Sequence, residues 1–206
     1  ASFDNCEDYL KGFGGTVHSV VLSYCSGKYA TPLTLVARYC PNLRVLAVFY
    51  CDLRLCVDFL KSLARLRSIE IKSITCSTDL DTINSAMHRL SIASIKLQCS
   101  SLDEEEAILG MCDPLCVQRL QLTNMTHTDW HTYVHLRSFG FYYDYSVHDA
   151  NLLVQICTLC PWIVNLEVYS SGWLSDEIVV PAIAALKQLR TFHCEYLDNL
   201  TDNVVN

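Results

Sequence analysis

One pattern of large apolar residues recurs along the chain: an apolar residue, two spacers, a second apolar residue, one spacer and a third. This apolar motif occurs eight times, beginning at residues 17, 43, 66, 92, 117, 136, 163 and 189. The second copy reads Leu43-x-x-Leu46-x-Val48. Alternate residues of a strand point to opposite faces of a sheet, so each copy predicts a strand with one buried face.

The segments between the motifs have helical apolar spacing, as in residues 32–39 and in Val180-x-x-Ile183-x-x-Leu186. Successive motifs begin 19 to 27 residues apart, which leaves room for one strand and one helix in each unit. A strand that is reached through a helix on the same side runs parallel to its predecessor. Stacked units can bury the apolar face that one unit cannot bury alone. The pattern therefore predicts an α/β solenoid of about eight strand–helix units.

The motifs divide the chain into a short flank, 1–16, and a solenoid, 17–206. We expect the flank to hold a remnant helix of a preceding repeat and a loop around Gly14. The shortest step leaves only a short or 3₁₀ helix between Leu122 and Leu136. No motif follows Cys194, and solenoids normally need polar end caps. The solenoid is therefore expected to be incomplete, or capped by a partner, at its C-terminal end.

Residues typical of helix termini flank the predicted helices. Ser175 and Asp176 precede the helix of the seventh unit, where side-chain oxygens can accept hydrogen bonds from the first backbone N–H groups. Cys40-Pro41 and Cys160-Pro161 follow two other helices. Proline cannot continue a helix, so it directs the chain toward the next strand.

These features resemble the cysteine-containing leucine-rich repeat of F-box proteins, which is roughly L-x-x-L-x-L-x-x-C followed by a helix that ends in C-P-x-L. Cys25 and Cys51 occupy the cysteine position of the first two units, and Cys40 occupies the closing position. Later units keep the apolar residues and replace that cysteine. The resemblance covers about residues 17–206 and implies a horseshoe with its parallel sheet on the concave side. The helical F-box itself is not expected within these residues.

Composition narrows the partners and the compartment. The chain has 206 residues, 51% of them apolar, with 12 cysteines and a formal net charge of −7 at pH 7. A negative charge disfavours nucleic acid and anionic membrane surfaces as partners. No apolar run is long enough for a membrane span. The cysteines fall mostly at recurring positions and are interpreted as buried thiols, which predicts an intracellular, reducing compartment, the cytoplasm or nucleus before an organelle.

Two groups of residues have spacing that could indicate a metal site. Cys157-x-x-Cys160 is half of a zinc or redox motif, but Cys160 also occupies the same position before proline as Cys40 in an earlier unit. His127, His131 and His135 would share one face of a continuous helix, but the next motif begins directly after them. We therefore expect structural roles for both groups, and no metal, cofactor or catalytic residue.

The residues between the apolar positions of each motif should point to the concave side, where a partner would bind. Strands lie about 4.8 Å apart, so Tyr142 and Tyr169 should be neighbours. Exposed aromatic residues with a polar rim are typical anchors of protein interfaces. The alternatives are that the rings shield the edge of the repeats, or that a flanking segment covers the apolar end. The candidate partner-binding residues are Tyr142, Tyr143, Glu167, Tyr169, Trp173, His193 and Glu195 near one end, and Val21, Phe49 and Tyr50 near the other.

The resemblance implies a non-catalytic protein–protein interaction module. The first role that the resemblance implies for this module is recognition of a substrate or partner, as in the F-box/LRR subunits of cullin–RING ubiquitin ligases. The alternative is a structural scaffold subunit of a large assembly, such as a ciliary, mitochondrial or ribosome-associated complex. The irregular repeat and the uncapped ends favour this alternative. An enzyme is not expected.

Overall fold

The structure is a computed structural model of the 206-residue chain. It describes residues 4–23, 30–50, 62–72, 91–98, 102–110, 112–123, 130–142, 151–169, 174–195 and 200–201. The chain forms two compact parts, Ala1–Asp113 and Pro114–Asn206, called here the first part and the second part. Both parts are α/β, as the sequence predicts. No helix in the described ranges is long and apolar enough to cross a membrane.

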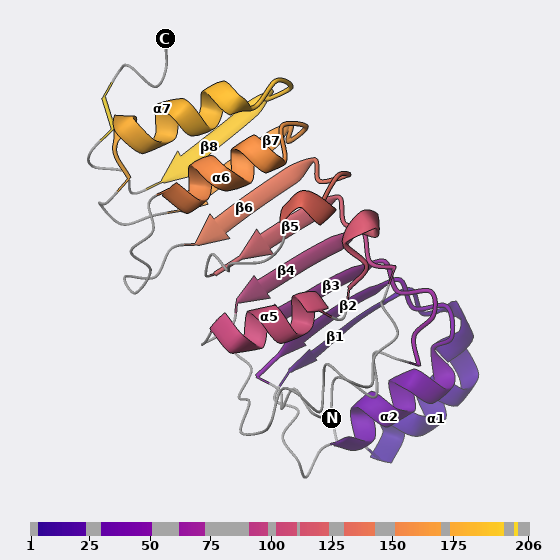
Figure 1. The fold of residues 1–206 in the computed structure, drawn as a ribbon. Helices are drawn as coiled ribbons and strands as arrows, with labels where there is room; N and C mark the ends of the chain where they lie inside the picture. The colour runs from indigo at the N-terminus through magenta and orange to yellow at the C-terminus, as the bar shows by residue number, and fades with distance from the viewer. Residues whose placement is uncertain are drawn as a thin grey trace. The chain divides into compact units, whose positions relative to one another are not determined.

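The first part contains four strands that lie side by side in chain order (Figure 1). Each of its strand pairs, β1–β2, β2–β3 and β3–β4, is parallel. Every strand coincides with a copy of the apolar motif, so the predicted parallel strands are confirmed here. The elements of the first part are α1 (Asp4–Phe13), the 3₁₀ helix η1 (Gly14–Thr16), β1 (Ser19–Ser23), α2 (Ala30–Tyr39), β2 (Val45–Phe49), β3 (Ser68–Lys72), β4 (Ser94–Gln98) and α5 (Leu102–Gly110).

The second part repeats this arrangement with four more parallel strands in chain order, and α6 and α7 lie side by side (Figure 1). The helix that the structure describes between β5 and β6, in the short fifth unit, is a 3₁₀ helix, as predicted. The elements of the second part are η3 (Pro114–Cys116), β5 (Arg119–Leu122), η4 (Trp130–Thr132), β6 (Ser138–Tyr142), α6 (Asn151–Leu159), β7 (Asn165–Tyr169), α7 (Asp176–Ala185) and β8 (Thr191–Glu195).

The same backbone hydrogen bonds recur from unit to unit. The N–H groups of Arg44 and Val45 both donate to the carbonyl oxygen of His18, at 2.9 and 3.0 Å. An equivalent pair joins β2 to β3, β3 to β4, β5 to β6, β6 to β7, and β7 to β8. These bonds set the register at the first residue of each strand. Register partners therefore occupy the same position of the motif in each of these strand pairs.

A turn with the same hydrogen bond leads from α2 into β2 and from α6 into β7. The N–H of Leu43 donates to the carbonyl oxygen of Cys40 at 3.1 Å, and that of Ile163 donates to Cys160 at 3.2 Å. Both cysteines are buried. The predicted equivalence of the two Cys-Pro sites is therefore confirmed in backbone geometry as well as in sequence.

The sheet of each part has one buried face. The apolar positions of β3, Ile69 and Ile71, are fully buried, whereas the residues between them are at least half-exposed. The helices contribute buried residues such as Leu33, Leu153 and Val179 to the core. We call the opposite side, formed by the residues between the apolar positions, the outward face.

The outermost described strands bury their apolar positions less well than the inner strands. Val20 and Leu22 of β1 are half-exposed, as is Phe192 of β8, and Cys194 is exposed. Beyond β8, Thr201 donates its backbone N–H to a carboxylate oxygen of Asp176 at 2.9 Å, and its hydroxyl bonds the other oxygen. This contact connects residue 201 to the start of α7.

The start and the buried side of α7 differ in detail from the sequence prediction. Ser175 is the N-cap residue, but its side chain makes no capping hydrogen bond. Its carbonyl oxygen accepts from the N–H groups of Ile178 and Val179 instead, both at 3.0 Å. The buried positions also begin one residue earlier than expected, at Val179, and Val180 is 39% exposed. Val179, rather than Val180, therefore faces the core.

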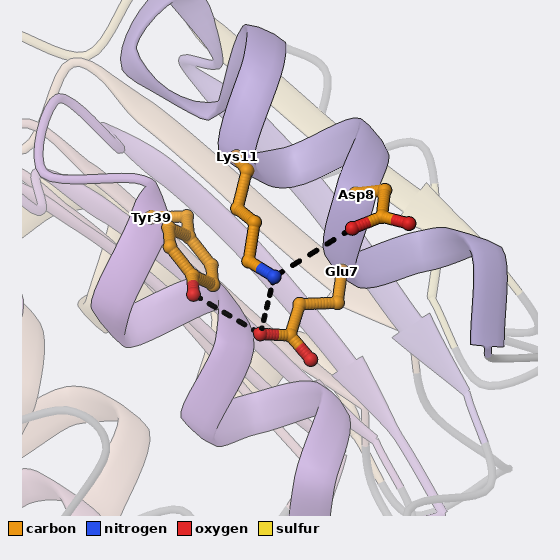
Figure 2. A network of polar contacts seen from close by, with 4 residues as sticks. All are labelled: Glu7, Asp8, Lys11 and Tyr39. Atoms are coloured by element: carbon orange, nitrogen blue, oxygen red, sulfur yellow. Dashed lines mark hydrogen bonds and ion pairs between the residues drawn. The ribbon is translucent and has the colours of Figure 1, made fainter.

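The flank before the first motif contains a helix, α1, and polar contacts join it to α2 (Figure 2). Glu7 accepts hydrogen bonds from the Lys11 ammonium and the Tyr39 hydroxyl, both at 3.1 Å. The hydrogen bond from Lys11 is the main reason that the pKa of Glu7 is lowered. Gly14 follows at the end of α1, where a Cβ atom would lie 2.4 Å from the Tyr39 carbonyl oxygen. Only glycine permits this approach of the two helix ends.

Two valine-to-alanine substitutions on β2 should differ in their effect on stability, because one valine lies on the buried face of the sheet and the other on the outward face. Val48 is 1% exposed and Val45 is 42% exposed. Val48→Ala should lower the free energy of unfolding by about 2 kcal/mol, because it removes buried methyl groups and leaves a cavity. Val45→Ala, on the same strand, should cost less than about 1 kcal/mol, the full range of strand propensity. Urea unfolding would measure both; equal losses would contradict the assignment of faces.

Candidate functional site

The outward face of β6, β7 and β8 carries five of the ten candidate partner-binding residues. The strand register places them in two rows that run across the three strands. One row holds Gly140, Glu167 and His193, and the next holds Tyr142, Tyr169 and Glu195. We call these six residues the aromatic–acidic face.

Two stacked tyrosines form the centre of this face. The rings of Tyr142 and Tyr169 are nearly parallel, at 13°, with their centroids 4.4 Å apart. The sequence prediction that they are neighbours is therefore confirmed. The ring of His193 lies on β8, with its centroid 5.5 Å from that of Tyr169. Both tyrosines are half-buried, so part of each ring remains accessible.

Glu167 lies between the tyrosine stack and a glycine. Its carboxylate accepts a long hydrogen bond, 3.5 Å, from the Tyr169 hydroxyl. A Cβ atom on Gly140 would lie 3.5 Å from the same carboxylate oxygen, so the side chain of Glu167 leans toward β6. No Lys, Arg or His nitrogen of the described residues lies within 4.0 Å of this carboxylate. Glu167 is thus a half-buried acid with no cation beside it.

The side chains of His193 and Glu195 contact each other. His193 Nε2 lies 3.0 Å from a carboxylate oxygen of Glu195 on the same strand. Burial, followed by the charge of Glu167, raises the pKa of Tyr169. Like-charge repulsion from Glu167 acts in this direction because it disfavours the tyrosinate. The surface is therefore aromatic and negatively charged.

The remaining candidate residues are elsewhere. Tyr143 and Trp173 lie outside the described residues. Val21, Phe49 and Tyr50 belong to the first part, where Val21 is 62% exposed and Phe49 is half-buried. Tyr50 has φ 57°, which is rare for a residue with a side chain, and its N–H donates to the Lys72 carbonyl oxygen at 2.9 Å. Val21 is the middle residue of β1, whereas Phe49 ends β2 and Tyr50 follows it.

The sequence analysis missed two features of the outward face. Val45, in the row of Ser19, is an exposed apolar residue of β2 that was not among the candidates. Gly140 was not recognised as the residue that makes room for the Glu167 side chain. The motif revealed that both point outward, but not how far neighbouring side chains would cover them.

The cysteines of the apparent metal or redox motif are core residues. Cys157 and Cys160 are both buried, and neither forms a disulfide. The Cys160 thiol donates to the carbonyl oxygen of Trp130 at 3.6 Å. Burial raises the pKa of Cys157 to about 12 and that of Cys160 to about 11. Both thiols are therefore protonated at neutral pH, and a thiol is a poor nucleophile and metal ligand.

The histidine group is only partly described. His131 lies in η4 and His135 lies in the turn before β6, so the two are not on one helix, while His127 is outside the described residues. Among the residues that the structure describes, no three His, Cys, Asp or Glu side chains are grouped as a metal site would require.

Comparison with known proteins adds no relative. No model of a known protein family matches the chain, and no curated protein sequence matches it.

Alkylation should distinguish the buried cysteines from Cys194. In the native protein at about pH 8, iodoacetamide should modify exposed Cys194 and leave Cys157 and Cys160 unmodified, because burial keeps these two thiols protonated. All three should react in urea. Peptide mass spectrometry would measure the extent at each site. Rapid modification of Cys157 in the native protein would contradict its placement in the core.

Tyr169→Phe should reduce the loss of stability at alkaline pH. The pKa of Tyr169 is higher in the folded protein than in the unfolded chain, so the folded state holds this proton more tightly. Its contribution to stability is intact below about pH 10, the ordinary tyrosine pKa, and is lost as the pH rises through the raised pKa. Urea unfolding from about pH 8 to 11 should show a smaller loss for the variant. Identical losses would mean that Tyr169 ionises normally.

Proposed function

We propose that the chain is a non-catalytic protein–protein interaction module that holds its partner on the aromatic–acidic face. The Tyr142–Tyr169 stack is the observation that carries this proposal. Tyrosines supply large contact areas with few rotatable bonds, and they are enriched at interface hot spots. The polar and acidic residues of the same rows would form the rim around this anchor.

The module is proposed to be a leucine-rich-repeat solenoid. The cysteine-containing repeat pattern supports this assignment, and so do the hydrogen bonds that recur between successive units. Within that class, recognition of a substrate or partner in an F-box/LRR subunit of a cullin–RING ubiquitin ligase is the first candidate role. Its support is the subtype of the repeat, which resembles that of F-box proteins.

A scaffold subunit of a large assembly is the second candidate role. The observation that favours it is the incomplete burial of apolar positions on the outermost described strands, at Val20, Leu22 and Phe192. A neighbouring subunit that packed there would bury them, as each inner unit buries the next. In this role the ends of the strand order, rather than the outward face, would hold the partners.

Replacing both stacked tyrosines should weaken binding of the partner. Tyr142→Ala/Tyr169→Ala should weaken binding by about 30-fold or more, the effect of losing about 2 kcal/mol at a hot spot. The matched control is Tyr9→Ala/Phe13→Ala, which removes another exposed aromatic pair, on α1, with centroids 5.2 Å apart. Affinity purification of tagged protein from its own cells, quantified by mass spectrometry, would compare both variants with the original chain.

The outcome separates the two roles. Proteins that are lost with Tyr142→Ala/Tyr169→Ala and kept with the control support binding at the outward face, and a cullin adaptor among the proteins purified supports the ligase role. If the double variant is folded, as judged by circular dichroism, and retains every partner, the aromatic–acidic face is not the interface. Retained partners that depend instead on Phe192 would support the scaffold role.

A further inference from the structure

An ion pair in the first part provides an internal reference for the aromatic–acidic face. Glu70 and Lys96 are the third residues of β3 and β4, and they are register partners on the outward face. The Lys96 ammonium lies 3.2 Å from the Glu70 carboxylate, and both side chains are partly exposed. This sheet therefore neutralises an outward glutamate with a lysine from the next strand.

Glu167 occupies the equivalent position in the second part, but no described residue pairs with it as Lys96 pairs with Glu70. It is the third residue of β7, and its register partner on β8 is His193. His193 directs Nε2 to Glu195, at 3.0 Å, rather than to Glu167. The partner on the other side is Gly140, which has no side chain. Glu167 therefore has a glycine as its neighbour on β6. Its neighbour on β8 is a histidine that contacts Glu195.

The described residues around Glu167 do not compensate its charge. None of the outward residues of β6, β7 and β8 is a lysine or arginine. Arg119 is the nearest arginine in the strand register, but it lies two strands away and at the start of β5. A half-buried carboxylate without a counter-ion is unfavourable, and a cation from outside the chain would remove that cost.

We infer that Glu167 is the docking point for an arginine side chain of the protein partner, which supplies the cation that Lys96 supplies to Glu70. This inference rests on the proposed function and names the chemistry of the partner. A guanidinium can bond a carboxylate through two parallel N–H groups and can also stack on tyrosine rings, and the Tyr142–Tyr169 stack begins beside the carboxylate. Glu195 adds a second negative charge, so an acidic or phosphate-bearing partner would be repelled.

Peptide binding to the full 206-residue chain tests the inference. The probe is Gly-Gly-Arg-Gly-Gly with both ends blocked, and the control peptide carries citrulline, which has the shape of arginine without its charge. Amide NMR shifts at low salt should show saturable binding of the arginine peptide at β6–β8, with a dissociation constant on the order of 1–10 mM for a single side chain. The citrulline peptide should bind about tenfold more weakly, because it offers no charge-assisted hydrogen bond.

Two variants assign the binding to the Glu167 carboxylate. Glu167→Gln removes the charge at nearly constant shape. His193→Lys places an ammonium where Lys96 stands relative to Glu70 and so fills the site from within. Each should weaken the arginine peptide about tenfold, as expected for loss of one charge-assisted interaction. Glu106→Gln, at an exposed position on α5, removes the same charge elsewhere and should leave binding unchanged.

Several results would overturn the inference. One is equal binding of the arginine and citrulline peptides, and another is unchanged arginine binding in both Glu167→Gln and His193→Lys. The amide spectra also show whether each variant is folded, and His193→Lys keeps the test valid if Glu167→Gln unfolds. If arginine binding fails while partner capture still depends on Tyr142 and Tyr169, this inference falls and the proposed function stands. If arginine binds at Glu167 but capture does not depend on the tyrosines, the proposed function falls instead.

Discussion

A pair of backbone N–H groups that share one carbonyl oxygen sets the register between neighbouring strands, and the outward face depends on that register. At the first such step, Arg44 and Val45 donate to the carbonyl oxygen of His18. A shift of one residue would move every apolar position of a strand from the core to the solvent. Ile69 and Ile71 are buried only in the observed register. The hydrogen bonds and the burial of apolar residues therefore favour the same register.

Because the register repeats, the outward residues form rows across the strands. The charge of each row depends on which side chains are register partners. The row of Glu70 and Lys96 combines opposite charges and is satisfied within the chain. The row of Gly140, Glu167 and His193 has the same backbone arrangement but no such pair. The same backbone arrangement thus carries a paired glutamate on β3 and, on β7, a glutamate without a neighbouring cation among the described residues.

The sequence predicted features that depend on periodicity and failed on those that depend on side-chain contacts. The strands, the short 3₁₀ helix before β6 and the Tyr142–Tyr169 pair follow from the spacing of apolar residues, and all are confirmed. The predicted side-chain cap at Ser175 was wrong, because the Ser175 side chain makes no capping hydrogen bond. The lean of Glu167 over Gly140 depends on rotamers across two strands, which one-dimensional periodicity does not contain.

The cysteines show how the repeat changes the meaning of a local motif. Taken alone, Cys157-x-x-Cys160 has the spacing of a metal ligand pair. Cys160 instead occupies the turn position that Cys40 occupies in an earlier unit, with the same hydrogen bond to the residue that opens the next strand. A small apolar thiol fits a buried turn, and burial in turn raises its pKa. Among the described residues, Cys157 and Cys160 therefore belong to the core. The carboxylate without a neighbouring cation, that of Glu167, lies on the outward face and is part of no short sequence motif.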